Sequence, residues 1–314
     1  MSVPLQTEKV TILLATYNGA QFIDEQLMSI ANQTWPNIDI MVSDDGSSDT
    51  TTDKIEQWSR KWTKGSFQTL CGPQKGYSEN FRHLIINLNK NTSYVAFCDQ
   101  DDVWYKDKIS NAIEKIISDG EISPLLYCSR TRLIDCTGKV IGLSRLYTKN
   151  PSFENALTQS LAGGNTIVLN APAFKLVLQS ALLTSFFSHD WWCYQLITGS
   201  GGRIIYDATP QLDYRQHHQN IFGKNTGILA LYRRALGVLS GKYSSWVIDN
   251  LNTLEKCRNI LSSKNIALVE NFQTERKRGG IICARFLFRN KIQRQTLMAT
   301  FGLYLSALIG KLSA

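Results

Sequence analysis

The chain has 314 residues, of which 43% are hydrophobic and 19% charged, and its formal net charge is +8. This composition excludes disordered, collagen-like and low-complexity proteins, and the length can supply one large core or two ordinary cores. The seven cysteines are scattered and never spaced as Cys-x-x-Cys, which argues against a disulfide framework and a zinc site. Residues 1–10 lack the features of a secretory signal, so we expect a cytoplasmic protein.

The positive charge is concentrated at the C-terminal end. Residues 1–223 hold 19 Lys+Arg and 22 Asp+Glu, a net charge of −3. Residues 224–314 hold 15 Lys+Arg and 4 Asp+Glu, a net charge of +11. A basic region of this kind indicates an anionic partner, either nucleic acid or a membrane surface.

The first 128 residues alternate short apolar runs with amphipathic segments. We predict strands at Val10–Ala15, Ile38–Ser43, Phe67–Cys71, Tyr94–Cys98 and Leu125–Cys128, and helices at Gln21–Asn32, Asp49–Trp62, Tyr77–Leu88 and Lys106–Ile117. Alternation of this kind predicts a mostly parallel sheet with helices on both faces. Ligands bind such sheets at the carboxyl ends of the strands.

The remainder of the chain is less regular and then helical. We predict a hairpin of Arg130–Asp135 and Lys139–Leu143, strands at Thr166–Asn170, Arg203–Tyr206 and Gln211–Tyr214, and a helix opened by Pro172. Beyond residue 224 we predict helices at Gly227–Ser240, Ser244–Leu261 and Asn265–Glu275, and from Ile281 onward. The predicted fold class is therefore α/β, with an all-α C-terminal extension.

Polar residues directly follow the first two predicted strands. Thr16, Tyr17 and Asn18 follow the first, and Asp44 and Asp45 follow the second. A turn that caps the next helix needs only one acidic or hydroxyl residue. A further carboxylate at a strand end can accept the imide N–H of a pyrimidine base. We therefore predict a nucleotide site here, with a purely structural turn as the alternative.

A glycine-containing loop follows the third predicted strand. Gly76 permits close approach of the backbone to a ligand, and Lys75 can meet a phosphate. The alternative is an ordinary loop in which Ser78 caps the next helix. We assign Gly76 to the nucleotide site and leave the role of Lys75 open.

Three carboxylates, those of Asp99, Asp101 and Asp102, lie within four positions after the fourth predicted strand. Carboxylates this close repel one another, and a divalent cation would make the arrangement favourable. Hard oxygen ligands suit Mg²⁺ or Mn²⁺ and leave positions for substrate phosphates. The alternative is an acidic turn that caps the following helix.

Two further motifs come from the second half of the chain. In His189-Asp190-Trp191-Trp192 the acid can act as a general base and the indoles can stack on a sugar, or the motif can be a helix cap with core tryptophans. In Arg215-Gln216-His217 the arginine can position other groups and the histidine can contact a diphosphate or a metal ion.

Together these motifs resemble the inverting family 2 glycosyltransferases, which have a GT-A fold. The resemblance covers residues 8–223 and includes Gly19, the turn at residues 44–49, Asn80 and the acidic segment at residues 99–102. Within that family, the motifs around residues 99, 190 and 215 are most similar to those of bacterial rhamnosyltransferases of surface polysaccharide assembly.

The resemblance implies a role for each candidate residue. Asp190 would be the catalytic base, and Asp99 and Gln100 would contact the nucleotide. Asp99, Asp101, Asp102 and His217 would hold Mg²⁺ or Mn²⁺. The acceptor or sugar site would include Trp104, Gly164, Asn165, His189, Trp191, Arg215 and Gln216.

The implied organisation is a GT-A catalytic domain at residues 1–223, with a donor half at 1–128 and an acceptor half at 129–223. The implied reaction moves a sugar, rhamnose from dTDP-rhamnose, to a hydroxyl group of a lipid-linked O-antigen or capsule intermediate. A UDP-hexose donor is an alternative. From other classes, the alternatives are a sugar nucleotidyltransferase and a non-catalytic glycan-binding protein.

The basic region at 224–314 ends in an amphipathic pattern. Seven Lys and Arg residues lie within residues 276–294, and the uncharged run Gln295–Gly310 follows. Sixteen residues are too few for the roughly 20 that span a bilayer, so we predict an interfacial anchor on the inner face of the cytoplasmic membrane. The alternatives are a packed helical subdomain and a dimer interface. Nucleic acid is not expected, because no binding motif accompanies the charge, and the sequence does not determine the oligomeric state.

Overall fold

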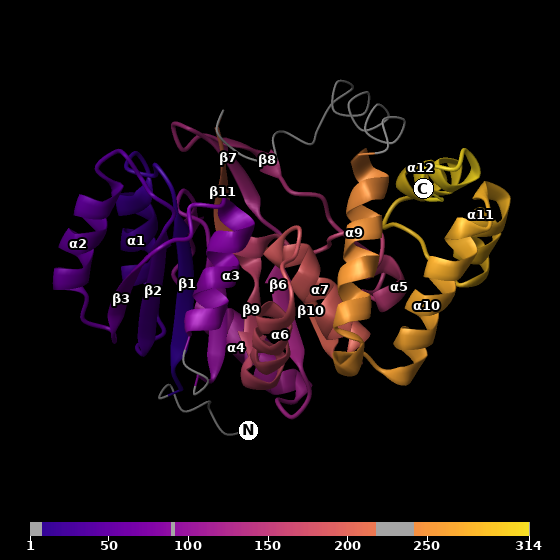
Figure 1. Cartoon of the computed structure of the whole chain (residues 1–314). Coiled ribbons are helices and arrows are strands. Elements are labelled where there is room, and N and C mark those ends of the chain that lie inside the picture. The colour runs from indigo at the N-terminus through magenta and orange to yellow at the C-terminus, as the bar shows by residue number, and fades with distance from the viewer. Residues whose placement is uncertain (1–7, 89–91, 218–241, 314) are drawn as a thin grey trace.

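The computed structural model describes residues 8–88, 92–217 and 242–313, drawn as the coloured ribbon in Figure 1. The predicted helix Gly227–Ser240 and the predicted domain boundary at residues 223 and 224 lie outside the described residues. Helices and strands otherwise follow the predicted order closely.

The central element is a twisted sheet of seven strands within the described residues, in the order β10-β6-β9-β4-β1-β2-β3. The strands are β1 (Val10–Thr16), β2 (Ile38–Asp44), β3 (Phe67–Cys71), β4 (Tyr94–Cys98), β6 (Leu125–Ser129), β9 (Val168–Asn170) and β10 (Arg203–Asp207). Only β9 runs antiparallel to its neighbours among these strands. The predicted α/β class with a mostly parallel sheet is confirmed.

Both faces of the sheet are buried, as expected for a parallel sheet covered by helices. Along β1, Ile12 and Leu14 belong to one buried cluster and Leu13 to another, which matches the two-residue period of a strand. The covering helices are α1 (Ile23–Ala31), α2 (Thr51–Lys61), α3 (Tyr77–Asn87), α4 (Lys108–Asp119), α6 (Ala171–Leu183) and α7 (His189–Gly199), with a short α5 (Phe153–Ala156) nearby.

A second, smaller sheet lies over the carboxyl ends of the main strands (Figure 1). It has the order β5-β11-β7-β8 and consists of β5 (Val103–Trp104), β7 (Arg132–Asp135), β8 (Val140–Leu143) and β11 (Leu212–Gln216). The hairpin of β7 and β8 was predicted, whereas β5 was not. Pairing of the two-residue β5 with β11 brings the segment after β4 against the end of β11. This contact positions the candidate site.

The C-terminal helices are α9 (Lys242–Lys256), α10 (Ser263–Lys277), α11 (Gly280–Arg289) and α12 (Leu297–Leu308). The predicted single helix from Ile281 onward is wrong. Lys291 adopts a φ of 54°, which ends one helix, and the Thr296 side chain accepts a hydrogen bond from the Ala299 N–H to begin the next.

These helices pack on the main sheet and its covering helices rather than forming a separate unit. Leu251, Phe272 and Leu303 belong to the same buried cluster as Phe97 and Trp192 of the sheet and α7. Polar contacts cross the same boundary: the Asn155 side chain donates to the Gln293 carbonyl at 2.8 Å, and the Tyr243 hydroxyl donates to the Thr158 carbonyl at 2.6 Å. These contacts match the alternative of a helical region that packs on the rest of the protein.

Replacement of Phe272 tests whether this core is shared. Phe272 is fully buried, so Phe272→Ala should lower the free energy of unfolding by about 3–5 kcal/mol. Because the cluster extends into the sheet, circular dichroism should show one transition that moves as a whole. Phe288→Ala is the control, since Phe288 is 72% exposed and its loss should change stability by less than about 0.5 kcal/mol. A separate early transition for the helices would contradict the shared core.

Candidate functional site

The loops after β1 and β2 are held together by side-chain hydrogen bonds. One carboxylate oxygen of Asp44 accepts from the Thr16 hydroxyl at 2.8 Å and the Ser47 hydroxyl at 2.7 Å, while the other accepts from the Ser47 N–H at 2.8 Å. Asn18 has a φ of 47°, and its side-chain oxygen accepts from the Ser48 N–H at 2.8 Å. Thr16, Asn18 and Asp44 thus shape this end of the sheet.

The neighbouring carboxylate, that of Asp45, fixes the loop after β3. Its two oxygens accept from the Gln74 N–H at 2.6 Å and the Gly76 N–H at 2.8 Å. Gly76 has a φ of +87°, a conformation that residues with a side chain rarely adopt. Hydrogen bonds from Asp44 and Asp45 thus join the loops after β1, β2 and β3.

Gln100 joins the acidic segment after β4 to the loop after β1. Its side-chain oxygen accepts from the Tyr17 N–H at 2.8 Å, and its side-chain nitrogen donates to the Tyr17 carbonyl at 2.9 Å. A Cβ on Gly19 would lie 2.2 Å from that oxygen, so only glycine fits beside the amide. The Tyr17 side chain remains 57% exposed, which leaves its ring open to a ligand.

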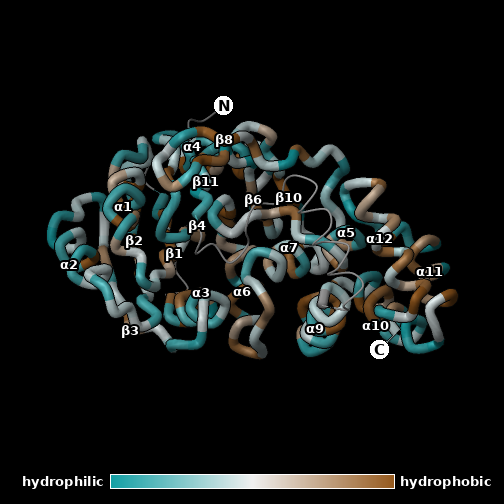
Figure 2. Tube along the Cα trace, turned by 90° about the horizontal axis from the view of Figure 1, so that it is seen from above, coloured by the Kyte–Doolittle hydropathy of each residue, from teal (hydrophilic) through white to brown (hydrophobic). Residues whose placement is uncertain are grey.

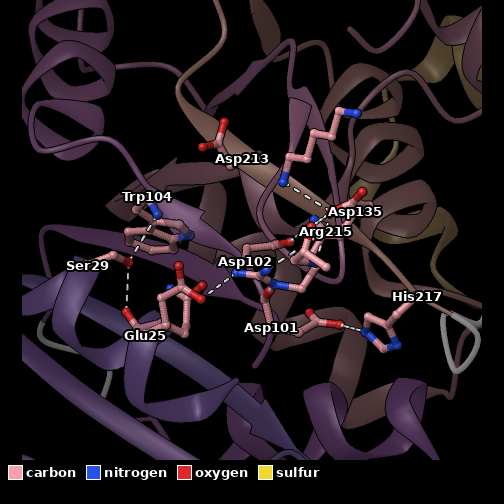
Figure 3. Close-up of polar contacts among 12 residues, drawn as sticks. Glu25, Ser29, Asp101, Asp102, Trp104, Asp135, Asp213, Arg215 and His217 are labelled. Atoms are coloured by element: carbon pink, nitrogen blue, oxygen red, sulfur yellow. Dashed lines mark hydrogen bonds and ion pairs between the residues drawn. The ribbon is translucent and has the colours of Figure 1, made fainter. Parts of the chain in front are cut away.

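Asp101 and Asp102 occupy different environments (Figure 3). The Asp101 carboxylate meets the His217 Nε2 atom at 2.6 Å. Asp102 has no exposed surface; its oxygens accept from the Asn165 side chain at 2.6 Å and the Arg215 N–H at 3.2 Å. Burial, with the charges of Asp101 and Asp99, raises the pKa of Asp102 well above its usual value. Both Asp102 oxygens are therefore occupied by protein donors, and its role as a metal ligand stays a prediction.

Asp99 and Asp190 share one electrostatic environment. Burial raises the pKa of Asp99 to about 7, and the charges of Asp101 and Asp190 add to the shift. Burial also raises the pKa of Asp190, although hydrogen bonds from Ser188 and from the Trp191 N–H at 2.7 Å oppose the rise. Because the charge of Asp190 affects the pKa of Asp99, the Asp190 carboxylate of α7 lies near the acidic segment. A carboxylate with a raised pKa is also a stronger base.

Arg215 connects the acidic segment to α1. Its Nε donates to the Asp101 carbonyl at 2.9 Å, and a terminal nitrogen pairs with Glu25 at 2.5 Å (Figure 3). The guanidinium lies 4.7 Å from the centre of the Phe22 ring, and the side chain is 2% exposed. These contacts fit the alternative of a positioning residue, and the contact of Arg215 with acceptor or sugar stays a prediction.

The two candidate stacking residues, Trp104 and Trp191, are core residues. Their exposures are 3% and 6%, so neither indole has an open face for a sugar. The Lys108 Nζ atom lies 3.3 Å from the centre of the Trp104 ring, and the Trp191 indole donates to the Ala156 carbonyl at 2.7 Å. Burial of Trp191 matches the alternative of a core tryptophan, and the roles of Trp104 and Trp191 at the acceptor or sugar site stay predictions.

His189 and Asn165 lie behind the candidate site. The His189 ring is 4% exposed and lies 3.8 Å from the Phe81 ring centre, and burial lowers its pKa to about 3. A Cβ on Gly164 would lie 2.2 Å from the His189 Nε2 atom, so a side chain at residue 164 would collide with the imidazole ring in this position. Asn165 is 4% exposed and bound to Asp102. Both side chains are thus buried, and their place in the acceptor or sugar site stays a prediction.

The remaining acceptor candidate, Gln216, ends β11 in a half-buried position beside Asp135. Its role stays a prediction. Sequence reasoning did not identify Glu25 or Phe22 as supports of Arg215, because both read as ordinary positions around the start of α1.

The acidic segment offers too few ligands to hold a cation by itself, and a substrate would have to supply the others. The described parts of the chain contain no group of three or more His, Cys, Asp or Glu residues arranged to hold a metal ion. Asp101 and His217 form an adjacent pair with mixed carboxylate and imidazole donors. Mg²⁺ commonly takes one or two carboxylates together with substrate phosphates and water. The pair therefore fits a site that a diphosphate completes.

The chain matches one protein-family model and several curated relatives. The model described as "Glycosyl transferase family 2" matches residues 11–181. The dTDP-rhamnosyl transferase RfbG of Shigella flexneri is 32% identical over 241 residues, which cover 73% of this chain and 80% of RfbG. The UDP-Glc:alpha-D-GlcNAc-diphosphoundecaprenol beta-1,3-glucosyltransferase WfaP of Escherichia coli is 34% identical over 106 residues, 34% of this chain and 40% of WfaP.

Two solved structures share the fold. TarS of S. aureus in complex with UDP-GlcNAc superimposes with a TM-score of 0.54 at 13% identity, covering 97% of this chain and 89% of that one. The mannosyltransferase PcManGT of Pyrobaculum calidifontis, in complex with GDP-Man and Mn²⁺, gives a TM-score of 0.50 at 15% identity, covering 99% and 89%. These likenesses show a GT-A-like fold.

Replacing Arg215 separates its buried contacts from its surface ion pair. Arg215→Met leaves the Asp101 carbonyl without its side-chain donor, whereas Asp102 keeps the backbone N–H of residue 215, and the variant should lower the free energy of unfolding by about 1–3 kcal/mol. Glu25→Gln should lower it by less than about 1 kcal/mol, because the Glu25 side chain is 55% exposed and solvent screens the pair. Urea titrations of both variants measure the difference. Equal losses would show that the surface pair carries the effect.

Proposed function

Because the chain belongs to glycosyltransferase family 2, we propose that it transfers rhamnose from dTDP-rhamnose to a hydroxyl group of a glycan acceptor, with inversion at the anomeric carbon. The observation that carries the donor assignment is the 32% identity to RfbG across 73% of this chain. Membership of this family makes the chain a glycosyltransferase. The alternatives of a sugar nucleotidyltransferase and a non-catalytic glycan-binding protein therefore do not apply.

A UDP-hexose donor is the second candidate. The relative WfaP is named for UDP-Glc, and TarS was solved with UDP-GlcNAc. Both share the scaffold with this chain, and donor sugars differ among enzymes of one fold. The shorter match to WfaP, 34% of this chain, makes this the weaker candidate.

For the donor, we propose that the exposed Tyr17 ring and the backbone around Gly76 contact the base and ribose. Thr16, Asn18, Asp44, Asp45 and Gln100 would shape that pocket through the hydrogen bonds that join its loops. Binding energy from these remote parts of the donor would position the anomeric carbon for attack.

For catalysis, we propose that Asp190 is the general base. Its carboxylate would take the proton from the acceptor hydroxyl while that oxygen attacks the anomeric carbon on the face opposite the diphosphate. The bond to the diphosphate breaks as the new glycosidic bond forms. Burial of Asp190 supports this role, since a raised pKa brings the base closer to the working pH.

Mg²⁺ or Mn²⁺ would neutralise charge on the leaving diphosphate, and Asp101 with His217 would hold it. Asp99 would lie beside this pair, where a positive charge would favour its ionised form. For the acceptor, we propose a glycan carried on a lipid at the inner face of the cytoplasmic membrane, as in O-antigen or capsule assembly.

A panel of sugar nucleotides tests the donor. We expect nucleotide release from dTDP-rhamnose in the presence of Mn²⁺ to exceed that from UDP-glucose, UDP-GlcNAc and GDP-mannose by at least about tenfold, the discrimination that one or two lost contacts produce. Coupled detection of the free nucleoside diphosphate measures the release. Faster release from UDP-glucose would favour the second candidate instead.

Asp190→Asn removes the proposed base while preserving the shape of the side chain. The variant should lose about 10²–10⁴-fold in kcat, since general base catalysis contributes that much, and should bind dTDP-rhamnose with a nearly unchanged Kd. In the unchanged enzyme, kcat/KM should fall as pH falls through a value above the ordinary Asp pKa of about 3.9, because protonation inactivates the base. Asp53→Asn, at an exposed position of α2, is the control. Normal turnover by Asp190→Asn would remove Asp190 from the mechanism.

Chelation tests the metal. EDTA should abolish transfer, and added Mn²⁺ or Mg²⁺ should restore it. Asp101→Asn should require a higher Mn²⁺ concentration for half-maximal rate, since it weakens one of the two proposed ligands. The Asp53→Asn control should retain the original Mn²⁺ requirement. Full activity after exhaustive chelation would show that the reaction needs no metal ion.

A further inference from the structure

The outer face of α12 is an exposed apolar surface. This 12-residue helix contains no charged residue, and it buries Leu303, Ser306 and Ala307 against the body. The opposite face exposes Leu297, Met298, Phe301, Leu305 and Leu308 by 38–82% of their surfaces. An amphipathic surface helix would carry polar residues on its outer face, so the apolar outer face of α12 calls for a partner.

A second apolar element lies beside it. α11 packs against α12, and a Cβ on Gly280 would lie 2.4 Å from the Leu308 carbonyl oxygen, which shows how closely the two helices approach. Ile281 and Phe288 of α11 are 76% and 72% exposed. Figure 2 shows hydrophobic stretches in both helices. We call Ile281, Phe288 and the five exposed α12 residues the apolar patch.

The chain segment that carries the apolar patch has charged residues of one sign, although Arg278 pairs with Glu275 just before it. Residues 276–314 contain eight Lys and Arg residues and no Asp or Glu. The exposed basic side chains are Lys277, Arg278, Arg285, Arg289, Lys291 and Lys311. An anionic surface would be complementary to this set. A two-fold dimer through the same face would instead bring two such sets of cations together.

We propose that the apolar patch and its basic surround bind the surface of an anionic bilayer, with α12 lying in the plane of the headgroups. No helix among the described residues is long and apolar enough to cross a membrane. A helix of 12 residues is about 18 Å long, and its apolar face can enter the headgroup region while the basic side chains meet anionic lipids.

The position of α12 suits the proposed reaction. In Figure 1, α12 lies at the upper right, on the same side of the molecule as the labelled ends of β7, β8 and β11 above the candidate site. An enzyme bound through α12 would therefore present this side to the bilayer. The inference deepens the proposed function and rests on it for the lipid-carried acceptor.

Vesicle sedimentation of the full chain tests the proposal. The chain should sediment with vesicles of equal parts phosphatidylglycerol and phosphatidylcholine and stay in solution with phosphatidylcholine alone. Met298→Ser combined with Phe301→Ser should weaken binding by about tenfold or more, because two exposed apolar side chains no longer enter the headgroup region. Leu182→Ser combined with Leu183→Ser is the matched control, since both are more than half exposed on α6.

The basic residues have their own test. Arg285→Gln combined with Arg289→Gln should weaken binding to the anionic vesicles by about 30-fold, as expected for two charges near the surface. Lys61→Gln combined with Lys175→Gln, at exposed positions of α2 and α6, should bind as the unchanged protein does.

Two results would overturn the proposal. One is equal vesicle binding by the α12 variant and the unchanged chain. The other is a dimer, seen in analytical ultracentrifugation, that Met298→Ser with Phe301→Ser converts to a monomer while vesicle binding persists. Failure of the proposed function is separate, because nucleotide release from dTDP-rhamnose in detergent solution does not require a bilayer. The α12 variant should retain that activity.

Discussion

The site depends on keeping several carboxyl groups together at the end of one strand. Asp99, Asp101 and Asp102 would repel one another in a free loop. The protein separates their environments instead. Asp102 is buried against Asn165 and the backbone of Arg215, while Asp101 meets His217 at the edge of the site. Burial raises the pKa of Asp102, which reduces the charge that must be held. The acidic segment can therefore stay ordered before any ligand arrives.

The loops after β1, β2, β3 and β4 form one connected unit, because a carboxylate or amide of each joins it to a neighbouring loop. Asp44 ties the β1 loop to the β2 loop, Asp45 ties the β2 loop to the β3 loop, and Gln100 ties the acidic segment back to Tyr17. Asp44, Asp45 and Gln100 were predicted to contact the ligand, and in the structure they also form hydrogen bonds that hold the loops together. Both roles are compatible, since a carboxylate oxygen accepts more than one hydrogen bond.

Much of this arrangement could be predicted from the sequence. The apolar periodicity gave the strands of the main sheet, and the rule that parallel strands share a carboxyl edge brought Asp44 and Asp99 to one region. Burial of Trp104 and Trp191 could not be predicted, because an indole beside a carboxylate has the same pattern whether it faces a sugar or the core. The role of Arg215 depends on the two-residue β5, which is too short to give a periodic signal. The break between α11 and α12 depends on one residue with a positive φ.

The core shared by the sheet and the C-terminal helices has a geometric consequence. Phe272 and Leu303 belong to one buried cluster with Phe97 and Trp192, so α12 cannot swing on a flexible tether. On a bilayer, side-chain packing would then fix the height above the lipid surface of Asp190, the proposed general base. The enzyme would then select acceptors by length. It would reach a hydroxyl group at one distance from the lipid carrier but not the hydroxyl groups of shorter or longer glycans.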